Sequence, residues 1–202
     1  MNLSKHCCSA FAEPGEERQA FQAQGHQDYD NFLKYRAEEL HLGGVLILAH
    51  CCVNEQGSTG CDQALHLVYK CAQSFLTSEE LLEFNYSTYL NSYAECIDPD
   101  LLARHSFQLI KAGFARIASP LYAKYRDGKL TLDEFAHAKT EWIRSWSESS
   151  LEQALKTTGL RTNENTEQVL NQIWTRYEEE VREKPGEYDD CTICTYMALK
   201  KI

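Results

Sequence analysis

The sequence predicts an α/β fold, and two neighbouring segments carry that prediction. Residues 17–42 place their apolar side chains at helical spacing on one stripe, and Gly43 and Gly44 follow, where a left-handed backbone can end a helix. Residues 45–51 are then apolar almost throughout, which is typical of a strand buried on both faces of a parallel sheet. Helix, Gly-Gly turn and buried strand make half of an α/β crossover, so we expect parallel neighbours for this strand.

Helical spacing and capping signals predict the elements that follow. Apolar residues recur at helical spacing over residues 61–75. Thr77 and Glu80 have the spacing of a capping box, in which each side chain bonds the other residue's backbone N–H, and so do Thr131 and Glu134. We therefore expect a short helix after Thr77 and one long helix, or two, after Thr131.

The remaining elements complete an alternating order of helices and strands. Asp98 before Pro99 predicts another helix start, and residues 106–112 read as a strand. Residues 169–181 form the clearest amphipathic helix, and residues 191–199 form a final β-rich stretch. We expect two apolar residues of that helix, Ile173 and Trp174, to be buried against the sheet.

Length and charge exclude several classes of protein. The chain has 202 residues, which fits one domain, and a formal net charge of −10. Nucleic-acid surfaces need clustered Lys and Arg, so we expect neither a nucleic acid nor an anionic membrane surface as partner. The longest aliphatic run, residues 45–48, is far shorter than the roughly 20 residues of a membrane-spanning helix. With no signal pattern at the N-terminus, we expect a cytoplasmic protein.

Nine cysteines do not form a disulfide pattern. Their number is odd, and two pairs are adjacent in sequence, Cys7-Cys8 and Cys51-Cys52. Free Cys behaves as a small buried hydrophobe in a reducing compartment. The one C-x-x-C, Cys191 and Cys194, falls on a predicted strand, where residues three apart point to opposite faces and chelate poorly. We therefore expect free thiols and no zinc site.

Several short motifs, in order, match one known family. They are Met1-Asn2-Leu3-Ser4, Gln24 and Asp28, Phe32-Leu33, Arg36-Ala37-Glu38, Gly43-Gly44, residues 76–85 ending in Phe-Asn, Tyr89 and Ser92, Ser106-Phe107, Ile143-Arg144, and residues 169–177. Their order and spacing resemble the SABATH family, the S-adenosylmethionine-dependent carboxyl methyltransferases such as the salicylate and jasmonate enzymes. The resemblance spans nearly all of this chain but only the later half of the family's domain.

The resemblance implies a partial Rossmann-like methyltransferase sheet with a helical substrate cap. The sheet would hold one buried parallel strand and a terminal antiparallel strand pair, all within a single domain, residues 1–202. Residues 17–52 would be the helix-strand unit, residues 53–104 and 120–165 the mainly helical cap, and residues 105–118 and 166–202 the sheet edge and last helix. The cap would lie over the carboxyl ends of the strands, where α/β folds bind ligands.

The implied reaction moves a methyl group from S-adenosylmethionine to the carboxyl group of a small acid. A carboxylate is already nucleophilic, so the protein mainly aligns it with the methyl group and excludes water. The chain has no obvious Ser-His-Asp or Cys-His arrangement, which is compatible with this reaction and equally with no reaction at all. We assign no catalytic residue.

Cofactor binding in the family lies in the earlier half of the domain. This sequence has no G-x-G-x-x-G, and Gly43-Gly44 precedes a strand rather than following one. We therefore assign no cofactor-binding residue and expect a truncated chain that is inactive alone. Two alternatives stay open: a non-catalytic module that pairs with another chain through an exposed sheet edge, and a shortened product without independent function. We expect self-association, or a partner that supplies the missing half.

Four residues are candidates for binding the acid. In the family, the Trp of a Trp-Leu-Ser loop and the residue before it contact the substrate carboxylate. Here Met1 stands at the position before that Trp, and Asn2 replaces the Trp itself. Asn2 can still donate through its amide, although we expect a chain end to be poorly held. Tyr89 and Trp142 are the candidates for the other side of the pocket, and the alternative for both is an ordinary place in the core.

The family can also bind magnesium beside its Phe-Asn stretch. The corresponding residues here are Phe84 and Asn85, but Leu82 replaces an aspartate ligand. Glu83 is adjacent, yet on a helix it points roughly 100° away from that position. A hard cation needs several oxygen ligands, so we expect Asn85 to act as a turn or capping residue rather than a metal ligand.

Overall fold

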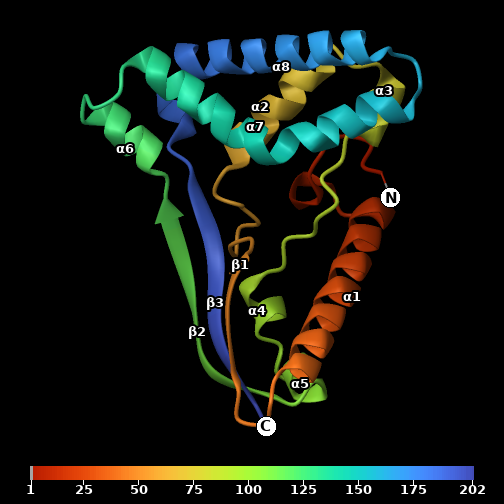
Figure 1. The fold of residues 1–202 in the computed structure, drawn as a ribbon, viewed down its shortest axis with the longest axis vertical. Helices are drawn as coiled ribbons and strands as arrows, with labels where there is room; N and C mark the ends of the chain where they lie inside the picture. The colour runs from red at the N-terminus through yellow and green to blue at the C-terminus, as the bar shows by residue number, and fades with distance from the viewer. Residues whose placement is uncertain (1) are drawn as a thin grey trace. The chain divides into compact units, whose positions relative to one another are not determined.

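The computed structural model describes residues 2–202, and the candidate Met1 lies outside them (Figure 1). The elements are η1 (Ser9–Phe11), α1 (Glu16–Glu39), β1 (Val45–Cys51), α2 (Asp62–Gln73), α3 (Ser78–Glu83), α4 (Tyr93–Cys96), α5 (Pro99–Arg104), β2 (Phe107–Ala118), α6 (Pro120–Arg126), α7 (Leu132–Thr157), α8 (Asn163–Glu183), η2 (Pro185–Tyr188) and β3 (Cys191–Lys201).

The chain forms two compact units. The helical unit comprises residues 2–13, 61–87 and 118–190, and the sheet unit comprises residues 14–60, 88–117 and 191–202. The segment 88–104, which we assigned to the cap, therefore groups with the sheet. That the two units together form a single domain, with the helices as a substrate cap, stays a prediction.

The sheet unit contains three strands in the order β1-β3-β2. β3 runs antiparallel to β1, with Val45 opposite Lys200 and Cys51 opposite Cys194, and β2 also runs opposite to β3 (Figure 1). The predicted terminal antiparallel pair is therefore present. The predicted parallel neighbours of β1 are not among residues 2–202, where its one partner is antiparallel.

The expectation that β1 is buried on both faces is wrong. Its side chains alternate between exposed and half-buried, and Ile47 is 80% exposed. The physical reason is that α1 covers one face only: Leu33 and Ala37 of α1 pack with Leu46 and Leu199 on that side. The other face carries apolar side chains that no element within residues 2–202 buries.

Gly43 forms the turn into β1 rather than ending the helix. α1 ends at Glu39, three residues before the predicted end, and Leu40 is already extended. Gly43 has φ +84°, a left-handed conformation that favours glycine. Its N–H donates to the Lys201 carbonyl at 2.8 Å, which ties the turn to the end of β3.

The helical unit has its own core. α7 packs along α8, and α2 packs on α8 as well. Ile173 and Trp174 are buried as predicted, but they lie in this cluster, which helices and loops supply and which contains no strand residue. The amphipathic pattern of α8 identifies its buried face correctly, but one stripe cannot specify whether a helix or a sheet covers it.

The local signals for helix starts are confirmed. The capping boxes of Thr77 with Glu80 and of Thr131 with Glu134 are both formed. Asp98 caps α5, with Pro99 at its first position. α7 is a single helix of 26 residues. β2 runs to Ala118, six residues beyond the predicted strand.

All nine cysteines are free thiols, as the sequence predicts. None of the helices within residues 2–202 combines the length and the hydropathy that crossing a membrane would require.

Candidate functional site

The N-terminal loop is anchored to the end of α3. The Asn2 amide donates to a carboxylate oxygen of Glu83 at 2.9 Å, and the Leu3 N–H donates to the side-chain oxygen of Asn85 at 2.7 Å. Leu3 is only 1% exposed. The expectation that Asn2 is poorly held is therefore wrong, because two side chains 81 and 82 residues away along the sequence fix Asn2 and Leu3.

Asn85 has the capping role that we expected. Its amide donates to the Leu82 carbonyl at 2.6 Å, while its side-chain oxygen accepts the Leu3 N–H. Phe84 is fully buried. The oxygen that would hold magnesium is thus engaged within the protein, and Leu82 offers no carboxylate, so the residues present do not fit this metal. Within residues 2–202, no group of three or more His, Cys, Asp or Glu side chains is arranged to hold a metal ion.

Trp142 lies at the surface of the helical unit. It is 37% exposed, and its ring meets that of Trp146, 42% exposed, edge-on at 5.7 Å between centroids. The Lys139 ammonium lies 4.3 Å from the Trp142 ring centroid, a cation–π contact. An exposed aromatic pair of this kind is available to a ligand, whereas a core residue would not be.

Tyr89 belongs to the other unit, in the segment before α4. Its hydroxyl donates to a carboxylate oxygen of Glu95 at 3.1 Å. Burial, together with the Glu95 charge, raises the pKa of Tyr89 to about 12, so the phenol stays neutral near pH 7. A Cβ on Gly25 would lie 2.5 Å from the Tyr89 Cβ, so a glycine is needed where α1 passes this ring. Tyr89 is held as a structural residue of the sheet unit.

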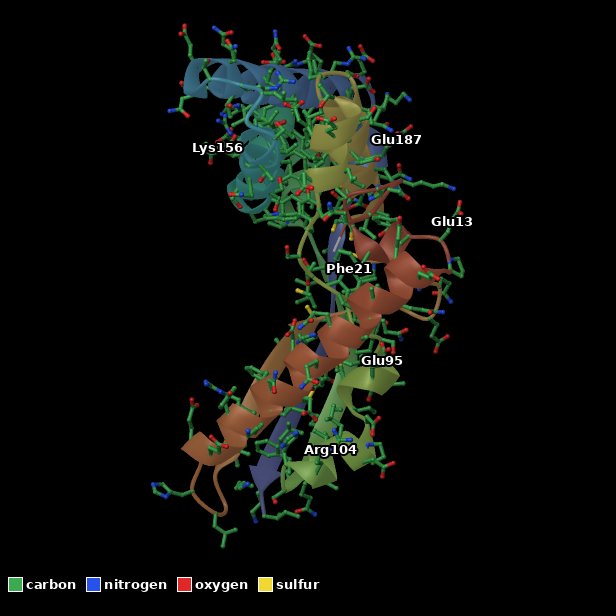
Figure 2. All side chains as sticks on the ribbon, turned by 90° about the vertical axis from the view of Figure 1, so that its right-hand side faces the viewer. Glu13, Phe21, Glu95, Arg104, Lys156 and Glu187 are labelled. Atoms are coloured by element: carbon green, nitrogen blue, oxygen red, sulfur yellow. The ribbon has the colours of Figure 1, made fainter. Side chains whose placement is uncertain are left out.

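Glu95 is the centre of a polar cluster beside α1 (Figure 2). His26 and Gln22, both on α1, donate to one carboxylate oxygen at 2.8 and 3.0 Å, and the Ser92 N–H donates to the other at 2.7 Å. Burial alone would raise the pKa of Glu95, but these hydrogen bonds outweigh it and bring the pKa down to about 2. A carboxylate satisfied in this way positions α4 against α1 and is a poor general base.

A second ion cluster lies farther along α1. Arg104 and His105 both bond one oxygen of Asp30, at 2.7 and 3.0 Å. Figure 2 shows Arg104 on α5, below Glu95 on α4. A cavity of about 180 Å³ lies among side chains of α1, α4 and α5 here. His26 pairs with Glu95 and Arg104 with Asp30, while Asp98 accepts backbone N–H groups of α5, which leaves little for a ligand to bind.

The larger pocket of the sheet unit was not predicted. It has a volume of about 620 Å³ and opens where β1 ends. Its lining residues are Val53, Asn54, Glu55, Gln56, Ser92, Tyr93, Ala94, Phe114, Arg116 and Ile193. The Val53 N–H donates to the Asn91 carbonyl at 3.1 Å, which joins two sides of the pocket. Its size lies within the range of small-molecule sites, roughly 300–1,000 Å³.

Arg116 is the one cation that lines this pocket. It is exposed, and no carboxylate of residues 2–202 forms an ion pair with it. Phe114, 46% exposed, lies two residues earlier on β2, and Glu55 contributes the one anion of the lining. An apolar cavity with an unpaired guanidinium suits a small organic acid, because Arg binds carboxylates through a planar pair of donors.

The structure brings some candidate residues together and separates others. Asn2 bonds Glu83 and the neighbouring Leu3 bonds Asn85 in the helical unit, where Trp142 also lies, whereas Tyr89 lies in the sheet unit. The capping-box spacing of Ser92 and Glu95 could have revealed that cluster from the sequence. Arg116 carries no such signal, because only the fold places it beside residues 53–56 and 92–94.

Comparison with known proteins identifies related sequences and folds. The sequence model of the family described as "SAM dependent carboxyl methyltransferase" matches residues 1–202. Among solved structures, one described as "Loganic acid methyltransferase with SAH" matches with a TM-score of 0.59 at 16% sequence identity. The match covers 91% of this chain and 49% of that chain, so this chain spans about half the length of the structure. A search of curated protein sequences found no match.

Proposed function

Because the chain belongs to the S-adenosylmethionine-dependent carboxyl methyltransferase family over residues 1–202, we propose that it binds a small carboxylic acid for methylation of the acid's carboxyl group. S-adenosylmethionine is the methyl donor of the family. The tasks left to this chain's residues are to bind the acid, orient its carboxylate and exclude water. None of these tasks needs a nucleophilic side chain or a general base.

The observation that carries the proposal is the unpaired Arg116 guanidinium at the apolar pocket of the sheet unit. A carboxylate entering the pocket gains charge-assisted hydrogen bonds from Arg116, while Phe114 and Ile193 accept the apolar part of the acid. The pocket opens at the carboxyl end of β1 and is also lined by residues before and within α4 and on β2 and β3. Glu55 lines the same pocket and disfavours a second carboxylate, so we propose a monocarboxylic acid.

The competing proposal places the acid at Asn2, whose role the family resemblance implies, and at the aromatic candidate Trp142. Trp142 offers an exposed ring, and Asn2 offers one amide, one N–H of which already bonds Glu83. Tyr89 bonds Glu95 and would contribute mainly shape. Met1 keeps its proposed role through the resemblance alone. Substitutions of Arg116 on one side, and of Asn2 and Trp142 on the other, decide which of the two locations binds the acid.

We also propose that residues 1–202 do not bind S-adenosylmethionine by themselves. The cofactor needs an anchor for its ribose hydroxyls and a glycine-rich loop whose backbone approaches its amino-acid end, and the sequence has no G-x-G-x-x-G. The chain spans about half of the related structure, so protein outside these residues, in the same or another chain, would supply that site. Cytoplasmic location remains part of this proposal, in keeping with nine free thiols.

The test is calorimetric titration of the purified chain with S-adenosylmethionine and, separately, with small monocarboxylic acids, including loganic, salicylic and an aliphatic acid. We expect binding of at least one acid and none of the cofactor. Arg116→Gln, which keeps size but removes charge, should weaken acid binding by roughly tenfold or more, since a charge-assisted pair contributes about 1.5–3 kcal/mol. Arg126→Gln, an exposed arginine of α6, is the matched control.

Each outcome of the titration separates the hypotheses. Loss of acid binding in Asn2→Ala and Trp142→Ala, with Arg116→Gln unchanged, would move the acid to the competing site. No acid binding at millimolar concentration would reject the acid-binding role, and micromolar binding of S-adenosylmethionine would reject the external cofactor site.

A second candidate function is a non-catalytic module that pairs through its sheet. Ile47 and Val45 on β1 are 80% and 54% exposed, and the outer edge of β1 has no strand partner within residues 2–202. Such an edge is a template for association. Association without binding of any acid would favour this alternative.

A further inference from the structure

Cys51 and Cys194 are directly opposite each other in the sheet. The register of β1 and β3 pairs these two residues at the last rung of their ladder. On the next rung, the Cys52 N–H donates to the Ile193 carbonyl at 3.0 Å, and at the other end the Lys201 N–H donates to the Gly44 carbonyl at 2.8 Å. Hydrogen-bonded and non-hydrogen-bonded pairs alternate along an antiparallel ladder, so Cys51 and Cys194 form a non-hydrogen-bonded pair.

This type of pair has the spacing that a disulfide needs. Its Cα atoms are about 4.5 Å apart and its side chains lie on the same face. Disulfides span Cα distances of roughly 4.4–6.8 Å, so the bond can form without moving either strand far. The neighbouring Cys52 lies on the opposite face, where its sulfur accepts a hydrogen bond from the Thr195 hydroxyl at 3.3 Å. Cys51 therefore has one suitably placed partner on its own face.

The two thiols differ in access to solvent. Cys51 is the one cysteine of residues 2–202 that is exposed, whereas Cys194 is 6% exposed. Burial, followed by the adjacent Cys51, raises the pKa of Cys194 to about 11. An oxidant in solution thus meets Cys51 first, and Cys194 is placed to react with the product.

We propose that Cys51 and Cys194 form a reversible thiol–disulfide pair that responds to low-molecular-weight disulfides such as oxidised glutathione. The Cys51 thiolate attacks one sulfur of the small disulfide, which forms a mixed disulfide and releases one small thiol. The Cys194 thiolate then attacks the Cys51 sulfur and releases the second small thiol. The two protein thiols lose two electrons, the small disulfide gains them, and the two protons of the protein thiols end on the released thiols.

The crosslink would join the end of β1 to the start of β3. Residue 52 follows immediately and leads into the segment 53–56 that lines the pocket, and Ile193 lines it from β3. The disulfide also closes a long loop of chain, which disfavours the unfolded state. Oxidation should therefore raise the thermal midpoint of the chain. The proposal rests on the register alone and does not depend on acid binding.

The test is to incubate the full 202-residue chain with oxidised glutathione, block the remaining thiols and map disulfide-linked peptides by mass spectrometry. We expect one dominant crosslinked peptide that contains Cys51 and Cys194 and disappears with dithiothreitol. Cys51→Ser and Cys194→Ala should both abolish it, and Cys194→Ala should leave Cys51 as a stable mixed disulfide with glutathione. Cys61→Ser, at a partly exposed cysteine of the helical unit, is the matched control and should leave the crosslink unchanged.

Two results would overturn the proposal. One is a wild-type chain in which Cys51 stays a mixed disulfide, because Cys194 would then be unable to reach it. The other is a dominant crosslink to a different cysteine, such as Cys52. Circular dichroism of each variant shows whether it is folded, and trapping of the mixed disulfide in Cys194→Ala keeps the test decisive if Cys51→Ser fails to fold.

Discussion

The side chains of Lys139 and Asp190 form an ion pair inside the helical unit. Lys139 lies on α7 and is 1% exposed at its side chain, and Asp190, just before β3, is 6% exposed. The Lys139 ammonium also contacts the ring of Trp142. Burial raises the pKa of Asp190, and the Lys139 charge opposes that shift. The pair therefore links the α7 surface that carries Trp142 to the segment that leads into the sheet.

Removing one partner of this pair should destabilise the helical unit strongly. Lys139→Met leaves a buried carboxylate without its cation, and we expect a loss of about 3–5 kcal/mol in the free energy of unfolding, measured with urea at pH 7. The double variant with Asp190→Leu should recover much of that loss, since it leaves no buried charge. Lys156→Met, which breaks the exposed pair with Glu152, is the control and should cost about 0–1 kcal/mol.

The stability loss of the single variant Lys139→Met should also depend on pH. Without Lys139, the pKa of Asp190 should rise further, so the protonated carboxyl is favoured in the folded state. The loss caused by Lys139→Met should therefore shrink as pH falls from 7 toward 4, because protonation relieves the buried charge. A loss that is independent of pH would show that the ion pair is not what the substitution disrupts.

Trp174→Ala should cost roughly 3–5 kcal/mol in the free energy of unfolding, since the indole is 3% exposed in the core of the helical unit. Trp174→Phe keeps most of the ring and removes an indole N–H that has no hydrogen-bond partner within residues 2–202, so it should cost clearly less. Trp142→Ala, at a 37% exposed ring, should cost less as well. An unchanged urea midpoint for Trp174→Ala would mean that the packing of α8 is misassigned.

Glu95 should give the sheet unit a stabilising contribution that is lost in acid. Its folded pKa of about 2 lies below its ordinary value of 4.5, so the contribution is complete above pH 4.5 and disappears as pH falls toward 2. Glu95→Gln should therefore be less stable than wild type at pH 7, by on the order of 1–3 kcal/mol. The difference between the two proteins should narrow between pH 4.5 and 2, in urea unfolding followed at each pH.

The control for this pH series is Glu38→Gln, an exposed residue of α1 in the same unit. At each pH from 7 to 2, this variant should have nearly the same free energy of unfolding as wild type. A Glu95→Gln variant that runs parallel to wild type from pH 7 to 2 would contradict the assigned shift.

The exposed face and edge of β1 should cause the isolated chain to self-associate. Ile47 is 80% exposed beside an edge that has no strand partner within residues 2–202. Sedimentation velocity should show mass that rises with protein concentration. Ile47→Lys should shift the chain toward monomer, whereas Leu160→Lys, at an exposed leucine between α7 and α8, should not. A monomeric wild type over a wide concentration range would rule out this prediction.

Local chemistry explains what the sequence predicted well. The capping boxes at Thr77 and Thr131 and the Asp98 cap depend on residues within three positions, so their pattern is visible in the chain itself. The same holds for the amphipathic stripe of α8 and for the strand at residues 45–51. The family resemblance likewise rests on ordered local motifs, and the family match over residues 1–202 confirms it.

The sequence by itself thus determined where elements begin, which side of a helix is buried and which family the chain belongs to. The tertiary structure alone decided what covers each apolar face: helices rather than the sheet over Trp174, and no element of residues 2–202 over Ile47. It also decided that Arg116 meets the pocket and that Cys51 lies opposite Cys194. The physical reason is that these contacts join residues far apart in the chain, and neither periodicity nor capping chemistry carries information beyond its own segment.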